Sequence, residues 1–184
     1  MEFIETEIPD VKIIKPTVFG DERGFFMETW QRRKFADAGI DYDFVQDNHS
    51  RSVRGTLRGL HYQIERPQGK LVRVTAGAVF DVAVDLRQSS PTFKQWVGVE
   101  LTADNKRQLW VPPGFAHGFY ALSDAVEFQY KCTDFYAPDH ERSIRWDDPE
   151  LGIKWPLGTE TSPEPLLSGK DRAAPWFSDA EVYA

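Results

Sequence analysis

Short apolar segments separated by turn residues run through the middle of this chain and constrain its fold most. They span residues 78–86, 95–101, 106–112, 114–122 and 125–136. The first segment, AVFDVAVDL, places Phe80, Val82, Val84 and Leu86 on one parity, with Asp81 and Asp85 on the other. Short strands with turn signals about every eight to twelve residues are typical of an antiparallel sandwich or barrel. The spacing therefore predicts an all-β domain.

Length and composition agree with one domain of this kind. The chain has 184 residues, of which 41% are hydrophobic and 14% aromatic. A chain of this length buries roughly 70% of its unfolded surface, and aromatic residues favour strands. No internal repeat or low-complexity run divides the chain, and a Pro- and Gly-rich arm begins only near residue 157. We expect a single domain over residues 1–184, with the arm ordered and carrying one short helical turn.

The N-terminal part predicts a hairpin followed by one helix. Residues 11–30 have the pattern strand, turn, strand, with the turn inside FGDERG. In TWQRRKFADAG, Thr29 can cap the start of a helix and Gly39 can end it.

Charge and cysteine content exclude several classes of protein. The net charge of −7 and the pI near 5.1 argue against a duplex nucleic-acid partner, which needs a basic face. The N-terminus lacks the pattern of a signal peptide, and no apolar run approaches the roughly 20 residues of a membrane span. The single cysteine, Cys132, rules out an internal disulfide framework. These features favour a soluble, cytoplasmic protein.

The segment RGLHYQIERPQGKLVRV, residues 58–74, departs from simple alternation. It predicts two strands joined by a turn at residues 66–69, forming a hairpin. On that hairpin Arg58, His61, Gln63 and Lys70 would lie close together. Arg58 and His61 are three residues apart, which sends them to opposite faces unless a bulge at Gly59 re-aims one of them.

Parity places two more polar side chains in the interior. Tyr130 shares a face with Val126, Phe128 and Cys132, and His117 shares a face with Phe115, Phe119 and Ala121. Both Tyr130 and His117 should therefore point inward.

Several titratable groups converging inside one domain would be costly to bury without a purpose. His can act as a general base, Tyr as an acid, and Lys or Arg can stabilise an oxyanion. The set suits proton abstraction next to a carbonyl. Taken singly, each residue has a structural explanation: a hydrogen-bonded core His, a packed Tyr, a solvated Lys. A metal site built from His61, Gln63, Glu65 and His117 is the competing interpretation, but two imidazoles and an amide suit zinc or iron poorly.

Long motifs in this sequence resemble the dTDP-4-dehydrorhamnose 3,5-epimerase family. They are, in order, FGDERGFFMETW, QDNHSRSVRGTLRGLHYQ, QGKLVRV, FDVAVDLRQSSPTF, NKRQLWVPPGFAHGF, YAPDHERSIRWDDPELGIKWP and LSGKDRAAP. The likeness covers roughly residues 3–175. It implies a cupin-type jelly roll that works as a homodimer, with N-terminal strands in the dimer contact and without a metal or other cofactor.

The resemblance also implies a reaction and its residues. The substrate would be dTDP-4-dehydro-6-deoxy-D-glucose, inverted at C3 and C5 to dTDP-4-dehydro-L-rhamnose. His61 matches the base of the family, and Asp171 in LSGKD matches its orienting partner. Lys70 would stabilise the C4 oxyanion, and Tyr130 matches the acid on the opposite face of the sugar.

Further positions align with the nucleotide-sugar contacts of the family. They are Arg23, Glu28, Gln46, Asn48, Arg58, His117, Glu141 and Lys170. Arg58 suits the diphosphate, because a guanidinium binds phosphate oxygens in pairs. Arg23 is expected to reach the partner subunit's site. Phe19 and Phe26 could stack on thymine or the sugar, or belong to the core.

Three alternatives stay open at this point. An epimerase that inverts only C3 or only C5 would use the same constellation. A non-catalytic cupin-like sugar-nucleotide binder would need the pocket but not the base. A metal-dependent cupin oxygenase is disfavoured by the ligand set.

Overall fold

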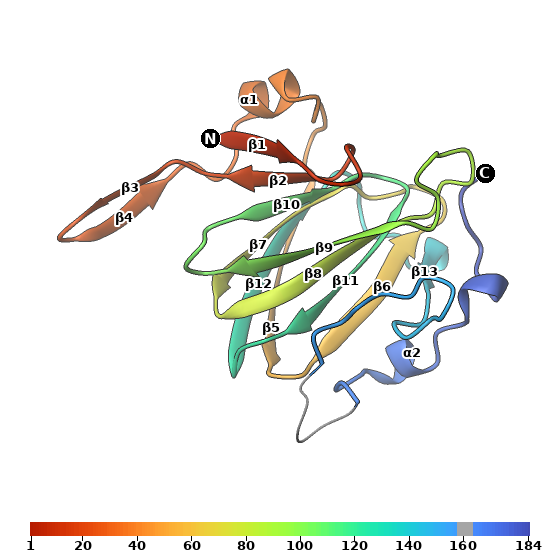
Figure 1. The fold of residues 1–184 in the computed structure, drawn as a ribbon. Helices are drawn as coiled ribbons and strands as arrows, with labels where there is room; N and C mark the ends of the chain where they lie inside the picture. Colours follow the sequence, from red (N-terminus) through yellow and green to blue (C-terminus); the bar gives the residue numbers. More distant parts are fainter. Residues whose placement is uncertain (158–163) are drawn as a thin grey trace.

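Two antiparallel sheets form the body of the computed structural model, which describes residues 1–157 and 164–184 (Figure 1). In sheet order, the six-stranded sheet contains β1 (Glu2–Glu5), β2 (Lys12–Lys15), β10 (Gln108–Val111), β7 (Lys70–Ala76), β12 (Ala125–Cys132) and β5 (Gln46–Val53). The five-stranded sheet contains β13 (Glu141–Ser143), β6 (Leu57–Gln63), β11 (Phe115–Ala121), β8 (Ala78–Asp85) and β9 (Trp96–Thr102). The all-β jelly-roll prediction is confirmed.

The main core lies between the two sheets. Val72 and Phe128 of the six-stranded sheet meet Phe115 and Phe119 of the five-stranded sheet there, all almost fully buried. The rings of Phe119 and Phe128 stack with centroids 4.4 Å apart. Full burial of one such side chain stabilises the fold by about 1.5–3 kcal/mol, so these contacts hold the sheets together.

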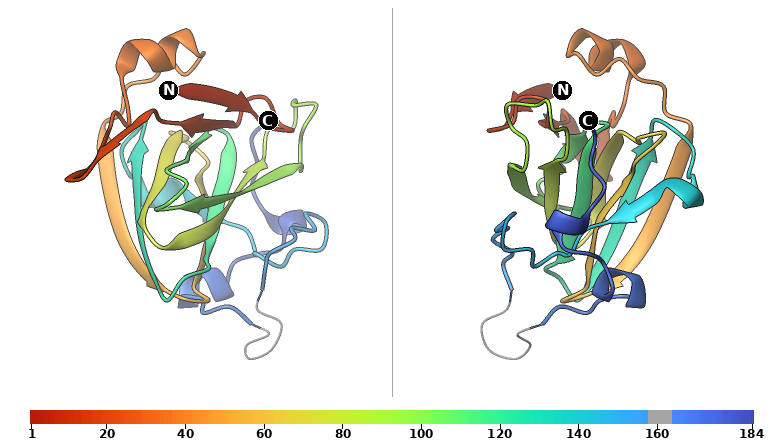
Figure 2. Two further views of the ribbon diagram at one scale, coloured as in Figure 1. Left: turned by 60° about the vertical axis from the view of Figure 1, so that its left-hand side comes forward. Right: turned by 90° about the vertical axis from the view of Figure 1, so that its right-hand side faces the viewer.

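A second apolar layer covers the outside of the five-stranded sheet. Val82, Val84 and Leu86 pack there against Trp155 and Phe177 of the C-terminal part of the chain, which runs along this face in Figure 2. The apolar parity of β8 therefore faces the C-terminal arm, and the parity of Asp81 faces the core between the sheets. In the described part of the arm, the expected short helical turn is present as α2 (Gly169–Arg172), and a 3₁₀ turn, η2 (Phe177–Asp179), follows it. Residues 158–163 of the arm lie outside the described residues.

Helix α1 (Arg32–Asp37) covers the outer face of the six-stranded sheet, where Phe35 packs with Ile14 and Trp110. The predicted cap at Thr29 is wrong: Gln31 is the N-cap, and its side chain accepts a hydrogen bond from the Lys34 backbone N–H at 2.7 Å. The chain leaves the helix through Gly39, whose φ of +84° is in the left-handed region, as predicted.

Strands β3 (Val18–Asp21) and β4 (Gly24–Met27) form a separate hairpin that projects from the body (Figure 1). Its turn falls within the predicted segment. Phe19 and Phe26 are paired across the two strands and are 63% and 71% exposed. They are therefore not core residues, and they face solvent in the single chain.

The predicted hairpin over residues 58–74 is wrong. Strand β6 belongs to the five-stranded sheet and β7 to the six-stranded sheet, and the connection between them crosses from one sheet to the other. The side chain of Gln63 holds this crossing: its amide donates to the Arg66 carbonyl at 2.8 Å and accepts from the Ala137 N–H at 2.8 Å. Because the strands lie in facing sheets, inward side chains of β6 and β7 face each other across the interior.

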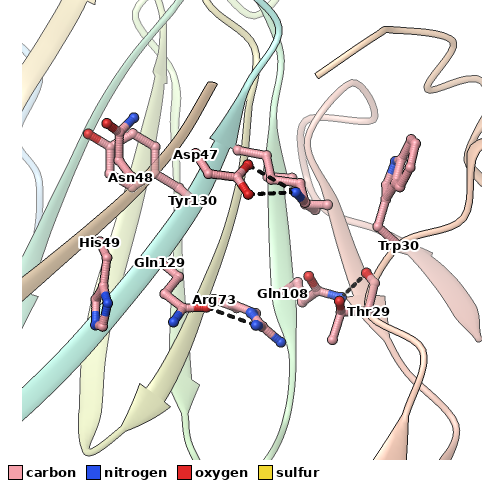
Figure 3. Close-up of a pocket in the computed structure, with 11 residues that line it drawn as sticks. Thr29, Trp30, Asp47, Asn48, His49, Arg73, Gln108, Gln129 and Tyr130 are labelled. Atoms are coloured by element: carbon pink, nitrogen blue, oxygen red, sulfur yellow. Dashed lines mark hydrogen bonds and ion pairs between the residues drawn. The ribbon is translucent and has the colours of Figure 1, made fainter. Parts of the chain in front are cut away.

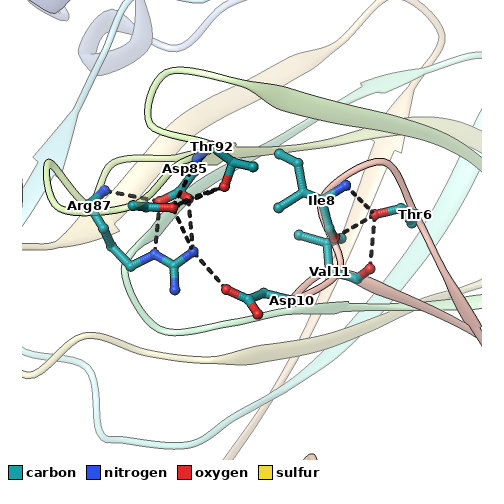
Figure 4. Close-up of polar contacts among 8 residues, drawn as sticks. Thr6, Ile8, Asp10, Val11, Asp85, Arg87 and Thr92 are labelled. Atoms are coloured by element: carbon teal, nitrogen blue, oxygen red, sulfur yellow. Dashed lines mark hydrogen bonds and ion pairs between the residues drawn. The ribbon is translucent and has the colours of Figure 1, made fainter.

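A polar network fixes the loop between β1 and β2 to the end of β8 (Figure 4). The Arg87 guanidinium donates to both carboxylate oxygens of Asp85 and to Asp10, at 2.8–2.9 Å. Ser90 and Thr92 donate to Asp85 Oδ2 at 2.6 and 2.7 Å. Asp85 is fully buried, and burial raises its pKa, but these hydrogen bonds outweigh burial and lower the pKa. This carboxylate therefore serves to hold the fold.

Candidate active site

A cavity of about 270 Å³ lies between the two sheets. The five-stranded sheet contributes Arg58, His61, His117 and Phe119, and the six-stranded sheet contributes Asn48, His49, Ser50, Lys70, Phe128 and Tyr130. A neighbouring hollow shares Asn48, His61, Lys70 and Tyr130 and extends to Gln46, Tyr136 and Glu141. The two hollows form one site.

His61 is held by Asp171. His61 Nε2 lies 2.5 Å from Asp171 Oδ1, and Ser168 Oγ donates to Asp171 Oδ2 at 2.7 Å. Ser168 also caps α2, so the short helix fixes the carboxylate behind the ring. Burial raises the pKa of Asp171, but the hydrogen bonds from His61 and Ser168 outweigh burial. The net pKa is lowered, and the carboxylate stays ionised. Because Nε2 donates to this carboxylate, Nδ1 of His61 is the nitrogen left for the cavity.

Lys70 enters the same cavity from the opposite sheet. Burial lowers the pKa of its ammonium, while the neighbouring Cys132, Asp81 and Glu141 raise it in part. An ammonium in such a place is a strong electrostatic partner for a negative oxygen, because water does not screen it.

Tyr130 stands on the six-stranded sheet, packed beside Phe128, as its parity predicted. Burial is the main cause that raises the pKa of its phenol to about 12, so the hydroxyl keeps its proton at neutral pH. Since Tyr130 and His61 project from facing sheets, a molecule in the cavity would have one of them on each side.

The predicted bulge at Gly59 is present. His117 pairs with His61 and Phe119 with Arg58, so three steps along β6 oppose two along β11. Gly59 has φ +127°, and a Cβ there would lie 2.5 Å from Gly118 Cα. The bulge turns both Arg58 and His61 toward the cavity.

Replacing Gly59 with Ala should destabilise the fold by on the order of 3 kcal/mol, because the methyl group adds a backbone clash to a strained φ. Thermal unfolding measures the loss. Gly39→Ala is the matched control: it has the same sign of φ but nothing within 4 Å of a Cβ, so only about 1 kcal/mol should be lost. Equal losses in the two variants would mean that β6 does not pack this closely on β11.

The remaining predicted binding residues outside the β3–β4 hairpin lie at the rim of the site. The Arg58 guanidinium donates to Ser52 Oγ at 3.0 Å and to the Arg51 carbonyl at 3.2 Å. Gln46 donates to Asn48 Oδ1 at 3.2 Å and accepts from the Tyr136 N–H at 2.8 Å.

Glu141 joins two further groups at this rim. It forms an ion pair with Lys170 and accepts a hydrogen bond from the Tyr136 hydroxyl at 2.8 Å. Burial raises the pKa of Glu141, but the bonds from Lys170 and Tyr136 outweigh it and lower the pKa. The rim therefore presents Arg58, the amides of Gln46 and Asn48, and the Glu141 carboxylate with Lys170 paired to it.

Two predicted binding residues do not reach this cavity within the chain. Arg23 lies at the tip of the β3–β4 hairpin, 85% exposed and paired with Asp21 at 2.5 Å. Glu28 follows the hairpin and accepts from the Lys34 ammonium at 2.7 Å.

Sequence reasoning missed Asp81 and Tyr136. Asp81 is fully buried and lies 2.9 Å from Nε2 of His117, which is nearly buried and lines the cavity. The available signal was a charged residue in the middle of a strand whose neighbouring residues are apolar. Tyr136 reaches the site from a loop, where no periodicity could place it.

A further hollow of about 360 Å³ shares Asn48, His49 and Tyr130 with the inner cavity, and its other lining residues include Leu71, Arg73, Gln129 and Lys131 (Figure 3). Its polar groups mostly bond to one another: Arg73 donates to Gln129 at 2.8 Å, and Lys131 to Asp47 at 2.9 Å. We therefore assign the chemistry to the inner cavity, where the acid–base groups converge.

Among residues 1–157 and 164–184, no group of three or more His, Cys, Asp and Glu side chains is arranged to hold a metal ion. Within the same residues, no helix is long and apolar enough to cross a membrane.

Comparisons with known proteins agree on one family. The family model described as dTDP-4-dehydrorhamnose 3,5-epimerase matches residues 5–179. The dTDP-4-dehydrorhamnose 3,5-epimerase of Pseudomonas aeruginosa is 60% identical over 100% of this chain and 99% of its own length. The structure of the dTDP-6-deoxy-D-glucose-3,5-epimerase of Legionella pneumophila, in complex with dTDP-4-keto-L-rhamnose, has a TM-score of 0.91 and 57% identity, covering 95% of this chain and 92% of that one. A 3'-monoepimerase from Streptomyces bikiniensis is also similar, with a TM-score of 0.87 and 34% identity over 95% of this chain and 87% of that one.

Proposed function

The chain belongs to the dTDP-4-dehydrorhamnose 3,5-epimerase family, and from that premise we propose how the inner cavity performs the reaction. The enzyme converts dTDP-4-dehydro-6-deoxy-D-glucose to dTDP-4-dehydro-L-rhamnose, a step of dTDP-L-rhamnose synthesis. The C3 and C5 protons are acidic because both carbons flank the C4 ketone. Each inversion removes a proton from one face of the sugar and returns one to the other face, so no oxidant or reductant is consumed.

His61 is the base. Its Nδ1 takes the proton from the substrate carbon, and the ionised Asp171 stabilises the imidazolium that forms. The electron pair moves onto the C4 oxygen, where the Lys70 ammonium stabilises the enolate. Tyr130 then donates its phenolic proton to the carbon from the opposite wall, and exchange with solvent restores both groups.

One observation carries this assignment. The base and the acid project from facing sheets into a single cavity, with Lys70 lining it as well. Inversion requires proton removal and proton return on opposite faces, and this arrangement supplies both. A binder without catalysis would need neither the His61–Asp171 pair nor a proton donor across from it.

We further propose that the enzyme acts as a homodimer, single-domain and cytoplasmic as expected from the sequence. The β3–β4 hairpin exposes Phe19, Phe26 and Arg23 away from its own body. On a second copy these residues, with Glu28, would complete the mouth of the cavity, where the dTDP group binds with Arg58 and Lys170. Sedimentation velocity should show a dimer, and a monomer with full activity would contradict this part.

An epimerase that inverts one carbon is the second candidate, because a 3'-monoepimerase shares the fold. Its 34% identity is well below the 60% of the double epimerase of Pseudomonas aeruginosa, which favours double inversion. A coupled assay separates the two: a reductase specific for dTDP-4-dehydro-L-rhamnose should consume NADPH when this enzyme and its substrate are added. No consumption, with substrate altered at one carbon, would identify a mono-epimerase.

The charge on Lys70 should set the alkaline limit of activity. Burial lowers the pKa of Lys70, so the ammonium loses its proton below the ordinary lysine pKa of 10.5, and kcat/KM falls as the pH rises through that point. Tyr130, at about 12, titrates too high to cause this fall. Lys70→Arg keeps a positive charge to higher pH and should move the alkaline limb upward. If kcat/KM fell at the same alkaline pH in the wild type and in Lys70→Arg, the ionisation of Lys70 would not be the cause of the fall.

A further inference from the structure

A second His–Asp pair lies beside the first. His117 and His61 are register partners on the adjacent strands β11 and β6, and both line the cavity. His117 Nε2 lies 2.9 Å from Oδ1 and 3.1 Å from Oδ2 of Asp81. Because a carboxylate only accepts hydrogen bonds, Nε2 carries the proton and Nδ1 is the nitrogen left for the cavity.

Asp81 is in an unusual place for a charge. Its side chain faces the core between the sheets and is fully buried. Val79 and Ala83, on the same face of β8, belong to the apolar cluster there. An apolar residue of similar size would often be at least as stable as a buried ion pair. Unlike Asp85, whose partners hold a loop to the end of β8, Asp81 is bonded to a residue that lines the cavity.

Lys70 connects Asp81 to the reaction. Asp81 and Glu141 on β13 are the carboxylates that raise the pKa of Lys70 against burial. The thiol of Cys132 on β12 also acts on Lys70, but burial raises the pKa of that thiol. Burial raises the pKa of Asp81, and His117 on β11 and Lys70 on β7 act against that rise and favour the charged carboxylate. Asp81 does not itself line the cavity, so any effect on the substrate passes through these two side chains.

We propose that Asp81 is a positioning residue for the epimerisation, which fixes the His117 ring with Nδ1 toward the substrate and keeps Lys70 charged for the C4 oxyanion. This role rests on the proposed function. It gives His117 one defined tautomer, and it supplies Lys70 with a negative neighbour that does not itself line the cavity.

Asp81→Asn tests the role, because the amide keeps the shape and one accepting oxygen but removes the charge. We expect kcat/KM to fall by on the order of 10²-fold, as for a small misplacement of groups that contact substrate. The alkaline limb of kcat/KM should move to lower pH, because the Lys70 ammonium loses an anionic neighbour. A merely structural residue would not shift this limb.

Asp85→Asn is the matched control. Asp85 lies on the same strand and is equally buried, but its partners are Arg87, Ser90 and Thr92 at the end of the barrel. It should lower the unfolding temperature while leaving kcat/KM and the alkaline limb near those of the wild type. An Asp81→Asn enzyme that behaves like Asp85→Asn would overturn the role of Asp81.

A measurement on the wild-type enzyme does not depend on the variant folding. Nitrogen-15 NMR of the His117 ring should show the proton on Nε2 in the neutral form, and a proton on Nδ1 would overturn the proposal. Turnover of the wild type is measured first. Its absence would contradict the proposed function itself, whereas an active wild type with an unchanged Asp81→Asn variant would contradict only the role of Asp81.

Discussion

His61→Asn should lower kcat by at least about 10³-fold, the size of effect that one general base supplies. Asn keeps a polar group of similar length near Asp171 but cannot take a proton from carbon. In the proposed function the dTDP group binds at the rim, through residues on other parts of the fold, so affinity for dTDP should stay nearly unchanged. Initial rates in the coupled assay and calorimetric titration with dTDP measure the two quantities.

His140→Asn is the control for this result. His140 is paired with Glu65 at 3.5 Å, on a 3₁₀ turn that does not line the cavity, and its loss should leave kcat near the wild-type value. If His61→Asn kept activity within tenfold of the wild type, His61 would not be the base. A parallel loss of dTDP affinity would instead assign His61 to binding.

Tyr130→Phe should separate proton removal from inversion. The base is intact in this variant, so C3 and C5 protons should still exchange with deuterium in D₂O, while return of a proton from the opposite face is lost. Inversion should fall by about 10²-fold or more, and exchange by much less. Mass spectrometry follows the label, and NMR follows the configuration.

Tyr120→Phe is the matched change, since Tyr120 is a buried tyrosine of the outer apolar layer. It should leave the ratio of exchange to inversion unchanged. Equal loss of exchange and inversion in Tyr130→Phe would mean that the hydroxyl serves binding or geometry and is not the proton donor.

The sequence predicted what depends on local periodicity. The parities of Tyr130 and His117 were correct because alternation within one strand fixes which side chains share a face. The bulge at Gly59 was predicted from the spacing of Arg58 and His61, and the structure has it. Motif resemblance brought in Asp171, which lies 110 residues from His61 in the chain and could not be paired with it by spacing.

The sequence failed where pairing is long-range. A turn between two strands predicts a hairpin, but β6 and β7 separate into facing sheets, and nothing local distinguishes the two outcomes. The apolar parity of β8 proved to be the outer one, because the C-terminal arm buries it. The sequence could not place Asp81 in the core between the sheets, because an arm more than 60 residues away decides which face of β8 points outward.

Incubation of dTDP-4-dehydro-6-deoxy-D-glucose with the enzyme in D₂O tests the central claim most directly. Proton NMR and mass spectrometry should show deuterium at both C3 and C5, in a product that the L-rhamnose-forming reductase accepts. Label at one carbon alone would contradict double epimerisation, and no label at all would contradict proton abstraction beside the C4 ketone in this cavity.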